Sequence, residues 1–166
     1  ADVFASNPGS YDPVSFDSGR RIRLSVCVIA KNEARFLPGC LESVRDWADE
    51  IVVLDTGSTD GTMDLARRMG ARVFSDVWQN DFSLARNAAI SRATGDWILA
   101  LDADERLDYI NGSRLRRLLG DAPPDCDAYQ LRIVSAADRI DSGVELVHFY
   151  PRVFRRHPAI RYKGAL

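Results

Sequence analysis

The sequence predicts an α/β domain in which helices flank a mainly parallel central sheet, followed by a smaller antiparallel C-terminal part. Two observations support this fold class. Short apolar runs, typical of strands buried on both faces, alternate with helical segments between residues 24 and 101. After residue 120, strand patterns follow one another without long helices between them. The first pattern favours parallel strands with right-handed crossovers, and the second favours antiparallel pairing.

The first expected strand covers Leu24–Ala30, and the first helix covers Phe36–Trp47 with Pro38 tolerated in its opening turn. The apolar positions of that helix recur at helical spacing, at Leu37, Leu41 and Val44. We expect this stripe to face the sheet.

A second strand, a second helix and a third strand come next. Their expected bounds are Glu50–Asp55, Thr62–Met69 and Ala71–Ser75. Asp60 or Thr59 is suited to cap the helix, and Gly70 is expected to end it in the left-handed conformation.

The third helix is expected to begin after Asp81, its N-cap, and to run to about Ala93 before a strand over Trp97–Leu101. We expect its inward-facing residues to be Leu84, Ala88 and Ala89. A short helix and two alternating strands follow, the last interrupted by Pro151. Their expected bounds are Ser113–Leu119, Tyr129–Val134 and Val144–Phe154.

Two segments make up the chain. Residues 1–22 are polar, rich in turn-forming residues and without periodicity, so an extended lead or linker is expected there. Residues 23–166 form the domain. The sequence has no initiator Met and ends abruptly, so we expect the domain to be truncated at its C-terminus.

The composition is that of a globular domain, with 166 residues and a net charge of −2. This charge does not indicate a nucleic-acid-binding surface. Three cysteines without C-x-x-C spacing indicate neither a disulfide framework nor a zinc site and fit a reducing compartment. No apolar run reaches transmembrane length, and no signal peptide is visible. We expect a cytoplasmic location, with peripheral attachment at the inner membrane face as a variant of it.

An acidic cluster ends the strand over Trp97–Leu101. Asp102 and Asp104 stand two residues apart, and in extended backbone such residues point to the same side. Ligands bind at this end of the strands in open α/β sheets, and Mg²⁺ is commonly held by one or two carboxylates plus substrate phosphates. A capped turn is the alternative interpretation of an isolated D-x-D.

Two other loops are expected at the same edge, over residues 31–33 and 55–62. Asp55 offers a carboxylate to a base edge or a ribose, and the backbone N–H groups near Gly57 and Ser58 favour anions. The glycine-rich loop is neither G-x-G-x-x-G nor G-x-x-x-x-G-K-[ST], so neither a Rossmann fingerprint nor a P-loop is supported. The three loops together could accept a nucleoside, a diphosphate and a cation.

Three motifs stand in order along the chain: SVCVIAKNEARFLPGCLESV, EIVVLDTGSTDGT and FSLARNAAISRATGDWILALDADERL. Together they resemble family-2 glycosyltransferases with the GT-A (nucleotide-diphospho-sugar transferase) fold, over about Leu24 to Leu107. The later RVFRRHPAIRYKG resembles the tail of the lipopolysaccharide-core glucosyltransferase-like subgroup.

The resemblance implies a bacterial enzyme that transfers a sugar, with inversion, from a nucleotide-sugar to an acceptor hydroxyl. The implied donor is a UDP-sugar, and the implied acceptor is a glycan, a lipid-linked molecule or a protein. The implied cofactor is Mg²⁺ or Mn²⁺.

The resemblance also assigns residues by position. Asp55 would bind the base, Asp102 the ribose or the metal, and Asp104 the metal. Arg86 would lie near the phosphates or be an exposed helix charge, and Asn87 would orient neighbouring backbone or cap locally. The full nucleotide-sugar set is Ala30, Glu33, Asp55, Gly57, Ser58, Arg86, Asp102, Ala103 and Asp104, of which Asp104 and Asp102 would hold the metal; Glu105 would lie behind the site or in solvent.

The general base is not identified by the sequence. Many relatives use a Glu-Asp pair on a later helix, and no such pair follows the acidic cluster here. The downstream acids are Asp138, Asp141 and Glu145, which are weak candidates. Relatives with this tail continue to a His-Glu pair whose His can complete the metal site, which leaves His148 and His157 as candidates by elimination. The sequence is therefore compatible with a fragment that lacks catalytic residues.

Two rival functions remain open at this point. A GT-A-like module could bind a nucleotide or a glycan without transferring a sugar. A haloacid-dehalogenase-like phosphatase also carries D-x-D after an apolar strand, with the first Asp as nucleophile. It needs Thr or Val after the second Asp, where this chain has Glu105, and a downstream lysine, for which only Lys163 exists.

Overall fold

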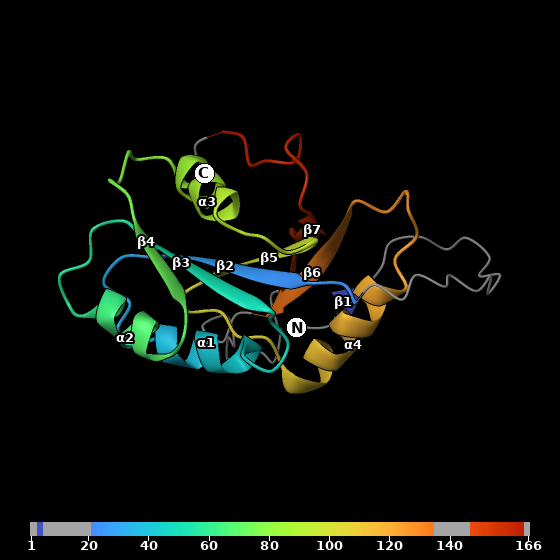
Figure 1. Ribbon diagram of the computed structural model, residues 1–166, viewed down its shortest axis with the longest axis horizontal. Helices are drawn as coiled ribbons and strands as arrows, with labels where there is room; N and C mark the ends of the chain where they lie inside the picture. The colour runs from blue at the N-terminus through green and yellow to red at the C-terminus, as the bar shows by residue number, and fades with distance from the viewer. Residues whose placement is uncertain (1–2, 5–20, 135–146, 165–166) are drawn as a thin grey trace.

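The computed structural model describes residues 3–4, 21–134 and 147–164. They form one seven-stranded sheet in the order β1-β6-β7-β5-β2-β3-β4 (Figure 1). The strands are β1 (Val3–Phe4), β2 (Leu24–Ala30), β3 (Glu50–Asp55), β4 (Arg72–Ser75), β5 (Trp97–Asp102), β6 (Ala128–Val134) and β7 (Val147–Arg155). The predicted α/β class is confirmed, and the expected strands match these bounds to within a few residues.

The parallel half of the sheet consists of β4, β3, β2 and β5. In its register Ala30 lies beside Asp55, and Ile29 lies beside Asp102. The carboxyl ends of β3, β2 and β5 are therefore neighbours at one edge of the sheet, as the alternation of strands and helices predicts.

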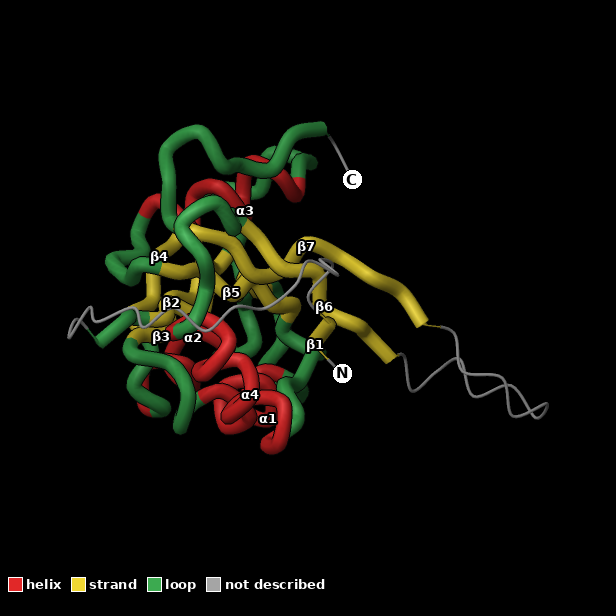
Figure 2. Tube along the Cα trace, turned by 90° about the vertical axis from the view of Figure 1, so that its right-hand side faces the viewer, coloured by secondary structure: helices red, strands yellow, loops and turns green. Residues whose placement is uncertain are grey.

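The antiparallel half begins where β7 pairs with β5. Strands β6 and β7 extend past the other strands (Figure 2), and β1, from the predicted N-terminal lead, pairs with β6. The expected interruption at Pro151 is wrong, because β7 continues through it. Pro151 pairs with Gln130 next to a register shift, where a missing N–H is tolerated.

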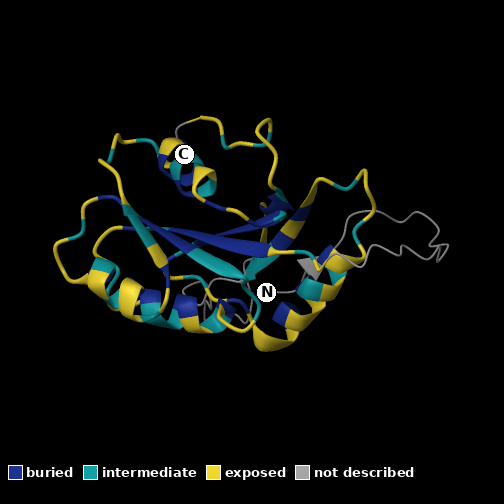
Figure 3. Cartoon of the chain, in the orientation of Figure 1, coloured by how far each residue is buried: buried dark blue, intermediate teal, exposed yellow. Residues whose placement is uncertain are grey.

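Four helices cover the two faces of the sheet: α1 (Leu37–Val44), α2 (Thr62–Arg68), α3 (Phe82–Ser91) and α4 (Tyr109–Gly120). In Figure 1, α3 lies on one face, and α1, α2 and α4 lie on the other. Each face has its own apolar cluster, so the central strands are buried on both sides (Figure 3). This explains the unbroken apolar runs of β2 and β5.

The local signals of the first two helices are largely confirmed. Leu37, Leu41 and Val44 are all buried, and Pro38 lies in the first turn of α1. Gly70 ends α2 with φ of +87°. The N-cap of α2 is Gly61 rather than Asp60 or Thr59, although the Asp60 carboxylate accepts from the N–H of Thr62.

Two details of the later helices differ from expectation. In α3, Asp81 caps the N-terminus, Ala89 is buried as expected and Ala88 packs partly buried against the same apolar cluster, but Leu84 is 48% exposed and Ala85 is buried instead. The buried polar side chains of Ser83 and Arg86 in the same helix set this rotation. Helix α4 starts four residues earlier than predicted, because Asp108 accepts from two N–H groups of its first turn.

The three cysteines, Cys27, Cys40 and Cys126, are free. Among the described residues, no helix combines the length and the apolar character that a membrane crossing requires.

Candidate functional site

Two of the loops at the carboxyl edge of the sheet are bonded to each other. The backbone N–H of Asn32 donates to Ser58 Oγ at 2.8 Å, and the N–H of Thr59 donates to Asn32 Oδ1 at 2.8 Å. Asn32 adopts φ of +58°, a conformation that Asn tolerates better than most residues. These hydrogen bonds hold the two loops in place relative to each other.

Asp55 is almost fully buried at the end of β3. Its Oδ2 accepts from the N–H groups of Gly57 and Ser58, at 3.0 and 2.9 Å. These two N–H groups are therefore engaged, which corrects the expectation that they are available to an anion. The other oxygen, Oδ1, is buried and has no hydrogen-bond partner among the described residues. A buried acceptor without a partner is costly, so it marks a place where a ligand donor would be favourable.

A pocket of about 310 Å³ opens at this edge. Its lining joins the ends of β2, β3 and β5 to the segment before α3 and consists of Ile29, Ala30, Lys31, Glu33, Thr56, Trp78, Phe82, Asp102, Ala103 and Asp104. The volume lies at the lower end of the range for small-molecule sites. One side of the pocket is acidic, and another is formed by Trp78 and Phe82, whose rings meet edge to face at 4.8 Å.

Asp102 is held by two buried arginines. Arg86 Nη2 from α3 lies 2.6 Å from Asp102 Oδ1, and Arg152 Nη2 from β7 lies 2.9 Å from Oδ2. The guanidinium of Arg152 also pairs with Glu105 at 2.8 Å, and Glu105 accepts from the backbone N–H of Asp102 at 2.8 Å. Both oxygens of Asp102 are thereby engaged by cations, so this carboxylate is poorly suited to bind a metal directly.

Burial and charge act together on this network. Burial alone would lower the pKa of Arg152, but the carboxylates of Asp102 and Glu105 outweigh it and raise the pKa. Burial raises the pKa of Glu105, and the nearby charge of Arg152 offsets only part of that rise. The network is therefore a compensated set of buried charges, which is strongly destabilised when one member is removed.

Asp104 is in a different situation. Its side chain is exposed in the turn after β5, and among the described residues none forms a hydrogen bond or ion pair with its carboxylate. Glu33 faces the same pocket; burial and then the charges of Asp104 and Asp60 raise its pKa. Asp104 lies in a turn rather than in extended backbone, so the expected same-side placement of alternate strand residues does not apply to it. Asp102 and Asp104 nevertheless both line the pocket.

No group of three or more His, Cys, Asp or Glu residues suited to a metal ion is found in the described part of the chain. A divalent cation would therefore depend on phosphate oxygens as well as on Asp104. This fits Mg²⁺ or Mn²⁺ on a diphosphate, because such ions commonly take one or two carboxylates plus phosphates.

The structure brings some predicted site residues together and separates others. Five of them line the pocket: Ala30, Glu33, Asp102, Ala103 and Asp104. Asp55, Gly57 and Ser58 lie in the adjoining loop, and Arg86 lies behind Asp102. The candidate bases Asp138, Asp141 and Glu145 lie outside the described residues.

The two histidines are not at this pocket. His148 is exposed near the start of β7. His157 lies near the opposite, amino end of β5, because the backbone N–H of the preceding Arg156 donates to the carbonyl of Asp96 there. The Nδ1 of His157 accepts a hydrogen bond from the backbone N–H of Ala159.

Sequence reasoning did not single out several residues of the site: Ile29, Lys31, Thr56, Trp78, Phe82 and Arg152. Trp78 lies in the loop before α3, and Phe82 is the first residue of that helix. The only sequence signal for either is the presence of two aromatic residues close to Asp81. Arg152 comes from β7, 50 residues after its partner Asp102, and no local pattern predicts that pairing.

Comparison with known proteins agrees with this architecture. The family model described as glycosyl transferase family 2 matches residues 25–163. A TPR repeat-containing protein of Synechococcus elongatus is 43% identical over 141 residues, which is 85% of this chain and 34% of that protein. The SPbeta prophage-derived glycosyltransferase SunS of Bacillus subtilis is 38% identical over 93 residues, covering 55% of this chain and 22% of SunS. The chain thus spans about a third or less of these two relatives.

Two solved structures are similar to the fold. The mannosyltransferase PcManGT from Pyrobaculum calidifontis, in complex with GDP-Man and Mn²⁺, matches with a TM-score of 0.56 and 27% identity, over 70% of this chain and 37% of that one. Glucosyl-3-phosphoglycerate synthase from Mycobacterium tuberculosis, in complex with UDP, matches with a TM-score of 0.52 and 25% identity, over 64% of this chain and 42% of that one. The family match covers most of the chain, and the fold agrees with it: this chain belongs to glycosyl transferase family 2 and has the GT-A fold.

Proposed function

We propose that the domain transfers a sugar, with inversion, from a UDP-sugar to an acceptor hydroxyl, and that a divalent cation bound through Asp104 is required. The observation that carries this proposal is the free carboxylate of Asp104 in a pocket at the carboxyl edge of the parallel strands. The acidic side of the pocket would repel a diphosphate, and a divalent cation bound between the carboxylates and the phosphates would offset that repulsion. The GDP-Man and Mn²⁺ of one structural relative and the UDP of another support this reading.

We expect each part of the donor to lie at a different point along the row of strand ends. Asp55 Oδ1, which is buried and has no partner in the described part of the chain, would accept a hydrogen bond from the base or the ribose at the end of β3. The exposed Lys31, at the end of β2, would lie by the diphosphate. Trp78 and Phe82 would exclude water from one side. The donor would thus run from β3 toward β5.

The chemistry requires charge stabilisation on the leaving group. Mg²⁺ or Mn²⁺, when bound, supplies Lewis-acid stabilisation to the departing diphosphate. Asp104 would hold the cation, and the network of Arg86, Asp102 and Arg152 would fix the turn from which Asp104 projects. The acceptor hydroxyl needs a general base, and Asp138, Asp141 and Glu145 remain the candidates.

The phosphatase alternative is not supported by this geometry. It requires Asp102 as a nucleophile, yet both oxygens of that carboxylate accept from arginines. A GT-A-like module that binds a donor without transferring its sugar would be recognised as an outcome of the following test.

Calorimetric titration with UDP, with and without MnCl₂, tests donor binding. We expect binding that depends on Mn²⁺ and that weakens at least about tenfold in Asp104→Ala, because a lost ligand removes a main contact of the cation. Asp125→Ala, which removes an exposed Asp remote from the pocket, is the matched control and should bind as the wild type does.

UDP release from a panel of UDP-sugars, each supplied with alcohol, glycan and peptide acceptors, tests transfer. Donor binding without transfer in the complete protein would support the non-catalytic module. Equal UDP binding by wild type and Asp104→Ala would contradict the metal site.

A further inference from the structure

The segment after β7 is fastened to α3 by two polar side chains. The amide of Asn87 makes two hydrogen bonds with the backbone of Tyr162: its Nδ2 donates to the Tyr162 carbonyl at 2.9 Å, and its Oδ1 accepts from the Tyr162 N–H at 2.9 Å. One helical turn earlier, Ser83 Oγ donates to the carbonyl of Gly164. Residues four apart lie on the same helix face, so α3 offers this segment a continuous polar edge.

The fastened segment brings the ring of Tyr162 onto Arg86. The guanidinium carbon of Arg86 lies 5.4 Å from the centre of that ring, within the range of a cation–π contact. The ring packs edge to face on Phe154, with centroids 6.0 Å apart, so it has a fixed backing. Burial raises the pKa of the Tyr162 hydroxyl, and the positive charges of Arg86 and Arg152 offset only part of that rise.

Arg86 has few other supports. Its side chain is only 10% exposed, its Nη2 bonds Asp102, and its Nε has no partner among the described residues. The ring of Tyr162 and the carboxylate of Asp102 are therefore its two principal contacts. Loss of the ring would leave the ion pair with Asp102 as the main contact of this buried guanidinium, so the positions of Arg86 and of the Asp102 carboxylate would be less fixed.

We propose that Asn87 and Ser83 are positioning residues of the donor site: they fasten Tyr162 over Arg86, which holds Asp102 and thereby the turn that carries Asp104. Asn87 is not among the residues that line the pocket, and in this proposal it acts through Tyr162. This inference rests on the proposed function, because its effect is expected in cation-dependent donor binding.

The test is calorimetric titration of folded protein with UDP and MnCl₂, at a temperature well below the unfolding midpoint of each variant. Asn87→Ala should weaken UDP binding in the presence of Mn²⁺ about tenfold, the range seen when groups that orient a metal ligand are removed. Asn111→Ala is the matched control. Asn111 is also a buried helical asparagine, but it lies in α4 on the other face of the sheet, and its loss should lower thermal stability without changing UDP affinity.

Variants of Tyr162 separate positioning from a general loss of structure. Tyr162→Ala should weaken UDP binding as Asn87→Ala does, and Tyr162→Phe, which keeps the ring, should restore affinity to near the wild-type value. If Asn87 acts through that ring, Asn87→Ala added to Tyr162→Ala should cause no further loss of affinity.

Three results would overturn the inference: unchanged affinity in Asn87→Ala, an equal loss in Asn111→Ala, or additive losses in the double variant. In each case wild-type binding of UDP with Mn²⁺ would leave the proposed function standing. A wild-type protein that does not bind UDP with Mn²⁺ would overturn both proposals together.

Discussion

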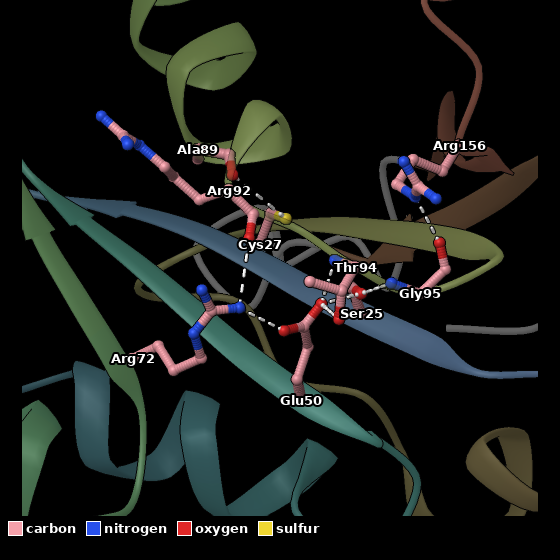
Figure 4. Close-up of polar contacts among 9 residues, drawn as sticks. All are labelled: Ser25, Cys27, Glu50, Arg72, Ala89, Arg92, Thr94, Gly95 and Arg156. Carbon is pink, nitrogen blue, oxygen red and sulfur yellow. Dashed lines mark hydrogen bonds and ion pairs between the residues drawn. The ribbon is translucent and has the colours of Figure 1, made fainter.

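Strand β3 carries an acidic residue at each end, and the two carboxylates differ in how completely they are hydrogen-bonded. At the amino end, Glu50 accepts hydrogen bonds from Ser25 of β2 and from the N–H and hydroxyl of Thr94, which precedes β5 (Figure 4). It also pairs with Arg72 of β4 at 2.6 Å. One carboxylate thus connects the starting points of all four parallel strands.

At the carboxyl end of the same strand, Asp55 keeps one buried oxygen without a partner among the described residues. Asp104, in the turn after β5 at the same edge of the sheet, is exposed, and no described residue pairs with it. The comparison teaches that the same chemical group, a carboxylate, serves two purposes in this sheet. Where partners are complete, the carboxylate stabilises the fold; where they are incomplete, it is available to a ligand.

Among Glu50, Asp55 and Asp104, the largest expected effect on stability is at Glu50, at the amino end. Burial opposes ionisation of Glu50, but the hydrogen bonds from Ser25, Thr94 and Arg72 outweigh it and lower the pKa to about 2, from 4.5. Glu50→Gln should therefore lower the free energy of unfolding at pH 7 by about 3 kcal/mol, measured by urea denaturation. UDP affinity in the folded variant should be unchanged. A stability loss below about 0.5 kcal/mol would contradict the structural role.

The same shift predicts a pH dependence. Because the pKa of Glu50 is lower in the folded than in the unfolded chain, its stabilisation is fully present above about pH 5 and is lost as the pH falls toward 2. The free energy of unfolding should fall with acidification over this range more steeply in the wild type than in Glu50→Gln. Denaturant titrations at a series of pH values measure both slopes, and parallel curves would contradict the assignment.

Two glycines, one near each end, sharpen the comparison. A Cβ added at Gly95 would lie 2.5 Å from Ser25 Oγ and 2.9 Å from the carbonyl oxygen of Arg23, so Gly95→Ala should cost about 2–3 kcal/mol by overpacking. Gly57 has open space around it, but its φ is +107°, so Gly57→Ala should cost only about 1 kcal/mol of backbone strain. Thermal unfolding should show a larger loss of stability in Gly95→Ala than in Gly57→Ala. A larger loss in Gly57→Ala would contradict this prediction.

The smallest expected effect on stability is at Asp104. Because its side chain is exposed and unpaired among the described residues, Asp104→Asn should change the free energy of unfolding by no more than about 0.5 kcal/mol. A fixed concentration of UDP and Mn²⁺ should raise the melting temperature of the wild type and of Glu50→Gln by similar amounts, and that of Asp104→Asn by less. Equal ligand-induced shifts in all three proteins would break the distinction between the two ends of the sheet.

Much of the fold could be predicted because its signals are local. The apolar runs of β2, β3 and β5, the Asp81 cap and Gly70 each depend on residues close in sequence. The same holds for the acidic edge, since strand ends fix where Asp55 and Asp104 emerge. The rotation of α3 could not be predicted, because it follows from the buried contacts of Arg86 and Ser83 with distant segments rather than from hydrophobicity.

The sequence by itself therefore determined the α/β class, the family resemblance and the edge of the sheet at which the acidic residues gather. Only the tertiary structure decided which of these carboxylates are free. Arg152 and Tyr162 reach the site from β7 and the segment after it, so the division of labour between Asp102 and Asp104 depends on contacts across 50 residues or more. The reason is physical: a carboxylate's chemistry depends on the charges and donors packed against it, and packing partners are not written in the local sequence.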